Sequence, residues 1–228
     1  MRRAPVLTRD RVRALDDEAV RRYGIPSMVL MENAAIGALA AARSMLRGVR
    51  SPRVVVCAGP GKNGGDGFAL ARHLHNDGAL VRIVTALSPG RCVGDGALQR
   101  DIVRRMGLSV GAWRAGLRLR PADLMVDALL GTGLSRPAAG PFAALIDAMN
   151  ASGVPILALD LPSGLDADSG PLPEAAVVRA ARTVTFAAFK PGLLLRASRP
   201  FTGRVSVAGI GAPRELIEAS SRGRGGAG

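Results

Sequence analysis

Short apolar runs alternate with segments of helical periodicity along most of the chain. Strand-like runs fall near residues 54–58, 81–86, 123–127, 155–159, 183–187 and 204–208, and helical patterns cover 65–77, 94–106 and 141–151. Parallel strands joined by crossover helices give this alternation, because such strands are buried on both faces while each helix buries one side. The pattern predicts an α/β fold with a mostly parallel central sheet covered on both faces.

Both ends of the chain depart from this alternation. Thr8 can cap a first helix that carries Val12 and Leu15 on one face, and a second helix is predicted from Pro26 to about Leu46. These form an N-terminal helical pair. Residues 220–228 are rich in glycine, arginine and serine, which is typical of disorder. We therefore expect a single domain over residues 1–219, followed by a disordered tail.

A glycine-rich segment follows the first predicted strand. Residues 59–67 contain five glycines and include Gly59-x-Gly61-x-x-Gly64, which matches a dinucleotide-binding fingerprint. A strand, a glycine turn and a helix in this order direct backbone N–H groups at an anion, most simply a pyrophosphate. The acidic residue that normally follows the second strand is missing, since residues 87–89 read Leu-Ser-Pro. The segment therefore does not predict an ordinary hydride-transfer cofactor site, and it also lacks the Walker spacing.

Polar turns follow four of the predicted strands. They cover residues 59–67, 127–137, 160–170 and 189–192. Ligands of open α/β sheets bind beyond the carboxyl ends of the strands, so we expect these turns to form one site at one edge of the sheet.

Composition excludes several classes of function. The net charge of +13 is compatible with nucleic-acid binding, but the basic residues are scattered and aromatic residues make up only 3% of the chain, so we expect no nucleic-acid partner. No apolar run is long enough to span a membrane, and the N-terminus lacks a signal-peptide pattern. Cys57 and Cys92 have no disulfide or zinc spacing, so a cytoplasmic location is expected.

Oxygen donors in these turns suggest a cation site. Asn63 offers an amide oxygen, Asp127 a carboxylate and Ser163 a hydroxyl, with no histidine or thiolate among them. Such donors suit an alkali or alkaline-earth ion, and the single carboxylate favours a monovalent one. The same residues could equally form a hydrogen-bonded cluster without an ion.

Asp160 and Lys190 are the candidate catalytic residues. Asp160 ends a strand and can act as a general acid or base, while Lys190 can tune it, orient a substrate or stabilise negative charge. Lys62 and Lys190 are the only lysines among 31 basic residues, and both fall in the polar turns. A simpler alternative is that Asp160 is only a turn former before Leu161-Pro162 and that the lysines lie there by chance.

Taken together, these segments resemble the NAD(P)H-hydrate epimerase family. The matching segments are 23–27, 31–34, 61–67, 127–134, 160–164, 183–186 and 190–192, in the order of the family. The resemblance implies a Rossmann-like three-layer αβα sandwich, often dimeric, so a homodimer is compatible with it. It implies interconversion of the R and S forms of hydrated NADH or NADPH (NADHX or NADPHX), and a dehydratase, expected on a separate chain, that restores the cofactor.

The resemblance also assigns residues. It implies substrate contacts from Lys62, Asn63, Gly64, Gly65, Asp66, Gly131, Thr132, Gly133, Leu134, Ser135, Arg136, Pro137 and Asp160. It implies one potassium ion (K+) per subunit at Asn63, Asp127 and Ser163. Our hypothesis for the reaction is loss and re-addition of water, in which Asp160 protonates the departing oxygen and activates the returning water.

Two residues depart from the family pattern, and other functions stay open. Lys62 replaces a usual asparagine, and Phe189 replaces a frequent proline. The dehydratase domain that is often fused in bacteria is absent here, so the chain is either a stand-alone epimerase or an excised or diverged piece. An NADP-linked reductase is one alternative, although Tyr23 is the only tyrosine and no Tyr-x-x-x-Lys pair exists. A nucleotide-binding scaffold without catalysis is another.

Overall fold

The computed structural model describes residues 4–119, 121–134 and 136–222. Within these ranges a seven-stranded sheet has the order β3-β2-β1-β4-β5-β8-β9, and all of its neighbouring strands run parallel. The strands are β1 (Arg53–Ala58), β2 (Leu80–Thr85), β3 (Ser109–Ala112), β4 (Leu124–Ala128), β5 (Ile156–Leu159), β8 (Arg182–Phe186) and β9 (Arg204–Ala208). The predicted parallel sheet is confirmed.

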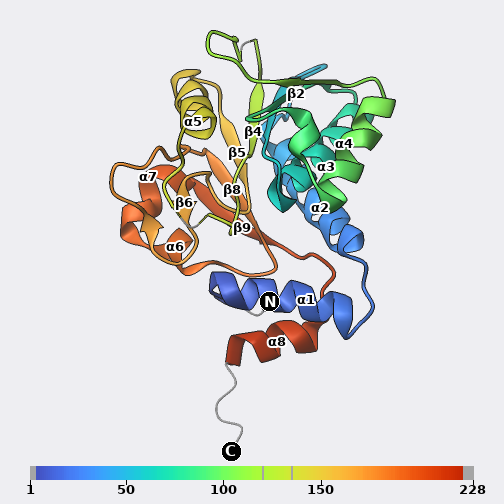
Figure 1. Cartoon of the computed structure of the whole chain (residues 1–228), viewed down its shortest axis with the longest axis vertical. Coiled ribbons are helices and arrows are strands. Elements are labelled where there is room, and N and C mark those ends of the chain that lie inside the picture. The colour runs from blue at the N-terminus through green and yellow to red at the C-terminus, as the bar shows by residue number, and fades with distance from the viewer. Residues whose placement is uncertain (1–3, 120, 135, 223–228) are drawn as a thin grey trace, which may run out of the picture.

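Helices cover both faces of this sheet, which gives the predicted three-layer αβα arrangement (Figure 1). On one side lie α2 (Ser27–Met45), α3 (Lys62–Asn76) and α4 (Gly94–Arg105), and on the other lie α5 (Pro141–Ala151) and the short α6 (Pro191–Leu194) and α7 (Arg199–Thr202). Helix α1 (Arg9–Arg21) packs beside α8 (Arg214–Arg222) at one end of the molecule. No helix in the described ranges is both long and apolar enough to cross a membrane.

Successive residues of the central strands alternate between the two cores. In β1, Val54 and Val56 face the core under α2 and α3, while Val55 and Cys57 face the core under α5. This is the two-residue period of a strand, and it explains why the strands read as continuous apolar runs. The apolar runs in the sequence therefore predict correctly that both faces of the sheet are buried.

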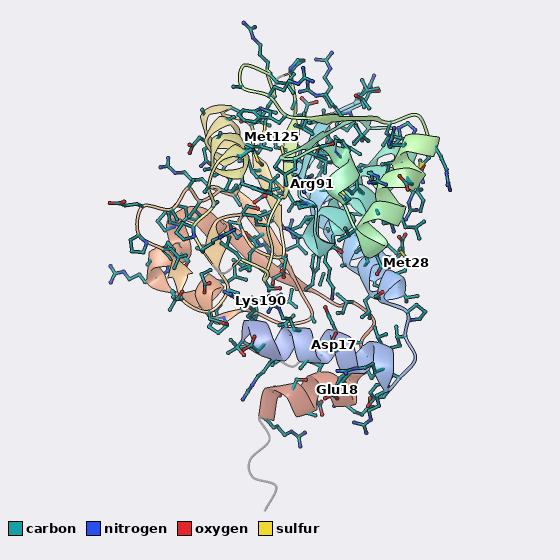
Figure 2. The ribbon with its side chains drawn as sticks, in the orientation of Figure 1. Asp17, Glu18, Met28, Arg91, Met125 and Lys190 are labelled. Carbon is teal, nitrogen blue, oxygen red and sulfur yellow. The ribbon has the colours of Figure 1, made fainter. Side chains whose placement is uncertain are left out.

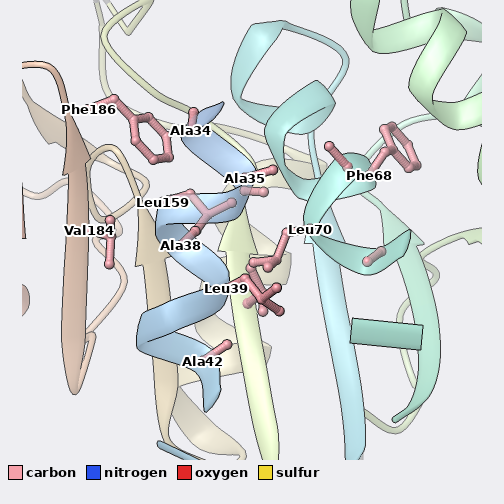
Figure 3. Packing of buried hydrophobic residues seen from close by; sticks show 14 of the residues in the cluster. Ala34, Ala35, Ala38, Leu39, Ala42, Phe68, Leu70, Leu159, Val184 and Phe186 are labelled. Carbon is pink, nitrogen blue, oxygen red and sulfur yellow. The ribbon is translucent and has the colours of Figure 1, made fainter. Parts of the chain in front are cut away.

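Alanines let α2 approach the sheet closely. Figure 3 shows Ala38 of α2 beside Leu159 of β5, and Ala34 near Phe186 of β8, with Ala42 further along the same helix. These five side chains are all buried. Small residues on one helix face allow a short distance between helix and sheet. The second predicted helix therefore packs closely against the core.

Several elements lie outside the sequence prediction. The elements that were not predicted are strand β3, the antiparallel pair β6 (Leu165–Asp166) and β7 (Gly170–Pro171), the helical turns η1 (Pro89–Arg91) and η2 (Arg196–Ser198), and helices α6, α7 and α8. Helix α8 extends to Arg222, so Ser220 to Arg222 are helical where a disordered tail was expected. Residues 223–228 lie outside the described part of the chain.

The glycine segment is more helical than predicted. Helix α3 begins at Lys62, three residues before the expected start, so only residues 59–61 form the connection. None of the glycines in this segment has a positive φ. Close approach explains them instead: a Cβ on Gly59 would lie 1.8 Å from the carbonyl oxygen of Leu129, and one on Gly64 would lie 1.9 Å from that of Gly59.

Candidate functional site

A cavity of about 680 Å³ lies beyond the carboxyl ends of β1, β4 and β5. Parallel strands bring the turns that follow them to one edge of the sheet, where open α/β folds bind ligands. The cavity is lined by Arg13, Asp17, Pro60, Gly61, Lys62, Asn63, Asp66, Leu129, Leu130, Gly131, Thr132, Gly133, Leu134, Arg136 and Asp160.

Asp160 forms part of the cavity wall at the end of β5. Its φ is +64°, and the N–H of Leu161 donates to the carbonyl of Leu159, so the chain makes a tight three-residue turn around Asp160. Such a conformation costs free energy for a residue with a Cβ, although aspartate and asparagine tolerate it better than most. The turn is held by the Asp160 N–H, which donates to the carbonyl of Val184 at 2.8 Å. The turn places the Asp160 carboxyl group at the cavity wall.

The two oxygens of Asp160 have different partners. Oδ1 accepts a hydrogen bond from Lys190 Nζ at 2.5 Å and one from Thr185 Oγ1 at 3.3 Å. Oδ2 accepts from the Thr132 N–H at 3.3 Å, and a Cβ on Gly131 would lie 3.1 Å from it. Oδ1 is therefore anchored in the protein, while Oδ2 lies beside the loop that lines the cavity.

Lys190 is fully buried behind Asp160 and does not line the cavity. Its ammonium group also donates to Thr185 Oγ1 at 2.8 Å and to the carbonyl oxygen of Phe186 at 2.9 Å. All three of its N–H donors thus have acceptors, which a buried charge requires. Lys190 therefore contacts Asp160 and has no open path to a ligand in the cavity.

The three predicted oxygen donors lie close together at the cavity floor, where Asn63 lines the cavity and Asp127 and Ser163 do not. Ser163 Oγ donates to Asp127 Oδ1 at 2.6 Å and accepts from the Leu130 N–H at 2.9 Å. Asn63 Nδ2 donates to the Leu130 carbonyl at 3.0 Å. The opposite atom, Asn63 Oδ1, is buried and has no hydrogen-bond partner. A buried acceptor without a donor is costly, and a cation beside it would satisfy it.

Asp127 is the acidic member of this cluster. It is fully buried, and desolvation raises its pKa to about 6, although hydrogen bonds from the Ser163 hydroxyl and from the Ser163 and Leu129 N–H groups lower the pKa in part. In the described part of the chain, no group of three or more histidine, cysteine or acidic side chains could hold a metal ion. The donor set of one carboxylate, one amide and one hydroxyl therefore suits a weakly charged ion.

Lys62 and Asp66 lie on the first turns of α3, where the wall of the cavity continues into a second hollow. This hollow has a volume of about 760 Å³ and shares Lys62 and Asp66 with the cavity. The Lys62 side chain is mostly exposed, and its Nζ lies 3.5 Å from Asp16 of α1. Asp16 is itself desolvated, which raises its pKa despite the nearby lysine.

Most of the predicted substrate residues meet at this cavity, but some do not line it. Gly64 and Gly65 lie buried within α3, where they permit close packing, and Pro137 is not in the cavity wall. Ser135 lies outside the described residues. Gly64 and Gly65 therefore shape the site through the position of the helix.

Sequence reasoning missed Arg13 and Asp17, which α1 contributes to the cavity. Figure 2 shows Asp17 on α1 and Lys190 at the same end of the molecule, where this helix crosses the edge of the sheet. Arg13 and Asp17 are four residues apart and therefore share one helix face. That spacing was visible in the sequence. Nothing in the sequence indicated that this face of α1 would line the cavity.

The chain is similar to known proteins over most of its length. The family described as "YjeF-related protein N-terminus" matches residues 27–192. An NAD(P)H-hydrate epimerase of Rhodopirellula baltica is 38% identical over 217 residues, which cover 93% of this chain and 87% of the relative. Another of Pirellula staleyi is 36% identical and covers 93% and 95% of the two chains.

Longer relatives and a solved structure also match. A bifunctional NAD(P)H-hydrate repair enzyme Nnr of Moorella thermoacetica is 40% identical over 211 residues, and the match covers 89% of this chain but 40% of that enzyme. The crystal structure of yeast ynu0 superposes with a TM-score of 0.78 at 24% identity and covers 97% of each chain. That likeness confirms the fold.

Proposed function

Because the chain belongs to the YjeF N-terminal family and matches NAD(P)H-hydrate epimerases over nearly its whole length, we propose that it is an isomerase of this kind. It interconverts the R and S forms of hydrated NADH or NADPH and so takes part in nicotinamide nucleotide repair. The observation that carries the proposal is the Asp160 carboxylate, which is paired with a buried lysine at the wall of a cavity large enough for a nucleotide.

The reaction follows from the chemistry of the substrate. The lone pair of the ring nitrogen helps to expel the hydroxyl group, which leaves a planar conjugated cation, and water then adds to either face. Asp160 handles the proton of that water, because its Oδ2 lies beside the Gly131–Thr132 loop at the cavity wall. The N–H groups of the first turn of α3, with Lys62, Arg13 and Arg136, attract the pyrophosphate of the substrate.

The proposal extends to a potassium ion at Asn63, Asp127 and Ser163. The unpartnered Asn63 Oδ1 and the single buried carboxylate fit a monovalent ion, which needs oxygen donors and little negative charge. Such an ion would supply positive charge beneath the cavity and link three separate turns.

We also infer how the product is used. The bifunctional relatives combine the region matched by this chain with additional sequence in one enzyme. A dehydratase on a separate chain would take the S form that this epimerase supplies. A homodimer remains compatible with the family.

The test is epimerisation of a substrate enriched in one form. S-enriched hydrated NADH is incubated with the protein, and the stereochemical excess is followed by chromatography. Loss of the excess supports the epimerase. Oxidation or reduction of intact cofactor would instead support an NADP-linked reductase, and binding without turnover would support a nucleotide-binding scaffold.

A further inference from the structure

A second carboxyl group faces the same cavity as Asp160. Asp66, on the second turn of α3, lines both the cavity and the adjoining hollow, and only 8% of the residue is exposed. Among the described residues, none donates a hydrogen bond to its carboxyl group or forms an ion pair with it. A carboxyl group that is more than nine-tenths buried, without a partner and directed into a cavity is costly when ionised.

The two carboxyl groups have opposite surroundings. Asp160 is paired with Lys190 at 2.5 Å, whereas Asp66 has no such partner. Burial raises the pKa of Asp66 well above its ordinary value, and the charges of Asp160 and Asp16 raise it further, while Lys62 and Lys190 lower it by less. Charged groups surround Asp66 from several elements. They are Arg13, Asp16, Asp17 and Arg21 of α1, Lys62 of α3, Asp95 of α4, Arg136 of the loop after β4, Asp160 after β5, and Lys190.

Two carboxyl groups with different surroundings in one cavity suit this reaction. Expulsion of a hydroxyl group needs a proton donor, and addition of water needs a proton acceptor. Pairs of acidic groups whose surroundings separate their pKa values are a general way to provide both at one pH.

We propose that Asp66 is the general acid that protonates the departing hydroxyl group, while the Asp160 carboxylate accepts the proton of the returning water. This assignment rests on the proposed epimerase function. It divides between two residues the acid and base roles that sequence reasoning gave to Asp160 alone.

The step balances in atoms and charge. The Asp66 proton passes to the hydroxyl oxygen, the carbon–oxygen bond breaks, and the lone pair of the ring nitrogen forms a carbon–nitrogen double bond. A water molecule then forms a new carbon–oxygen bond, the double bond returns its electrons to nitrogen, and Asp160 takes the released proton. Asp66 ends ionised and Asp160 ends protonated.

This end state has a stereochemical consequence. We place one carboxyl group on each face of the nicotinamide ring. The protonation of Asp66 and Asp160 after one turnover is then the protonation that the reverse turnover requires. Proton exchange with solvent restores the starting form. This symmetry suits a reversible epimerase, because each form of the substrate is both consumed and produced.

The test compares Asp66→Asn with wild type and with Asp147→Asn, a control in which an exposed carboxyl group of α5 is changed. At pH 7 we expect Asp66→Asn to lower kcat at least about a hundredfold while KM changes by less than about twofold. Asp147→Asn should match wild type. The wild-type kcat should also fall as the pH rises through the raised pKa of Asp66, because Asp66 then loses its proton, and the residual activity of Asp66→Asn should lack this fall.

Stability provides a readout that needs no turnover. Since the pKa of Asp66 is raised on folding, wild type loses stability as pH rises from the ordinary pKa of an aspartate to the raised value, and Asp66→Asn does not. The variant should therefore gain stability relative to wild type as the pH rises through this interval.

Two outcomes separate this inference from the proposed function. If wild type epimerises the substrate and Asp66→Asn keeps kcat within about threefold of it, Asp66 is not the acid, although the epimerase function stands. If wild type itself leaves the stereochemical excess unchanged, the proposed function fails. A raised KM with normal kcat would show that Asp66 only binds substrate, which also overturns the inference.

Discussion

At the scale of single residues, the backbone at Asp160 determines which substitution is informative. Its φ of +64° is unfavourable for most residues, whereas asparagine adopts it readily. Asparagine also keeps the size of the side chain, although its single amide oxygen can accept either from the Thr132 N–H or from Lys190, not from both. Asp160→Asn therefore removes the charge and the proton-accepting ability without changing the turn.

We expect Asp160→Asn to lower kcat at least about a hundredfold with substrate binding largely kept, as measured by epimerisation and by equilibrium binding. The variant should also be less stable, since removing one partner of a buried ion pair costs about 3–5 kcal/mol and leaves Lys190 without its counter-charge. Activity is therefore measured well below the variant's Tm. Near-normal turnover would exclude Asp160 from the proton transfer.

Thr185 is a positioning residue in this arrangement. It is fully buried, and its hydroxyl group contacts both Lys190 and Asp160. Thr185→Val should lower stability by about 1–3 kcal/mol, because the ammonium group of Lys190 loses an acceptor. It should also lower kcat more than it raises KM. Without the hydrogen bond from Thr185, the Asp160 carboxyl group can rotate to an additional orientation.

Thr185→Ser is the matched control, because it keeps the hydroxyl group and removes only a methyl group. Activity and its pH profile should return most of the way to wild type in this variant. A purely structural role for Thr185 would be indicated if Thr185→Val lowered Tm without a change in kcat or in the pH profile.

At the scale of elements, the first turns of α3 depend on close backbone contacts. Because Gly64 has no side chain, the start of the helix can pack against the connection after β1. Gly67 likewise lets the helix pack against Ala128 of β4. Helix and strand approach closely enough to align Asn63 and Asp66 with the cavity. The glycines thus position functional side chains that lie beside them.

Gly64→Ala should destabilise the protein by about 3 kcal/mol, because the new Cβ would lie 1.9 Å from a backbone oxygen that has little room to move. Chemical unfolding measures this. Gly61→Ala is the control: its φ is −93° and a Cβ there would meet nothing within 4 Å. Equal stability of the two variants would contradict the close-packing explanation.

At the scale of the whole molecule, the proposed ion would connect α3 with the turns after β4 and β5. An ion that binds the folded state alone stabilises it by about 2.7 kcal/mol at about a hundred times its Kd, and each kcal/mol raises Tm by about 2–4 °C for a protein of this size. We therefore expect Tm to rise with K+ relative to a bulky organic cation at equal ionic strength.

Asn63→Leu should abolish this rise in Tm, because it removes the unpartnered amide oxygen. Asn76→Leu, at the exposed end of the same helix, should keep it. If K+ and the organic cation gave the same Tm with wild type, the three oxygen donors would be a hydrogen-bonded cluster without an ion.

The sequence by itself determined the sheet and most of its flanking helices. Buried parallel strands such as β1 and β4 need apolar residues on both faces, and the helices between them need one apolar side. The spacing of apolar residues in each segment therefore indicates whether it forms a strand or a helix. The polar residues at strand ends followed from the same pattern, since parallel strands gather their carboxyl ends at one edge. Asp160, Asp127 and Lys190 could therefore be singled out from local sequence alone.

Only the tertiary structure decided which of these residues are buried, which are paired and which face the cavity. It showed Lys190 fully buried behind Asp160, Asp66 without a partner at the cavity wall, and Arg13 of α1 facing the same space. Burial, pairing and the docking of a distant helix depend on contacts between segments far apart in sequence, and a local pattern carries no record of such contacts. Charge and pKa follow from those contacts, so the division of acid and base roles is a property of the fold.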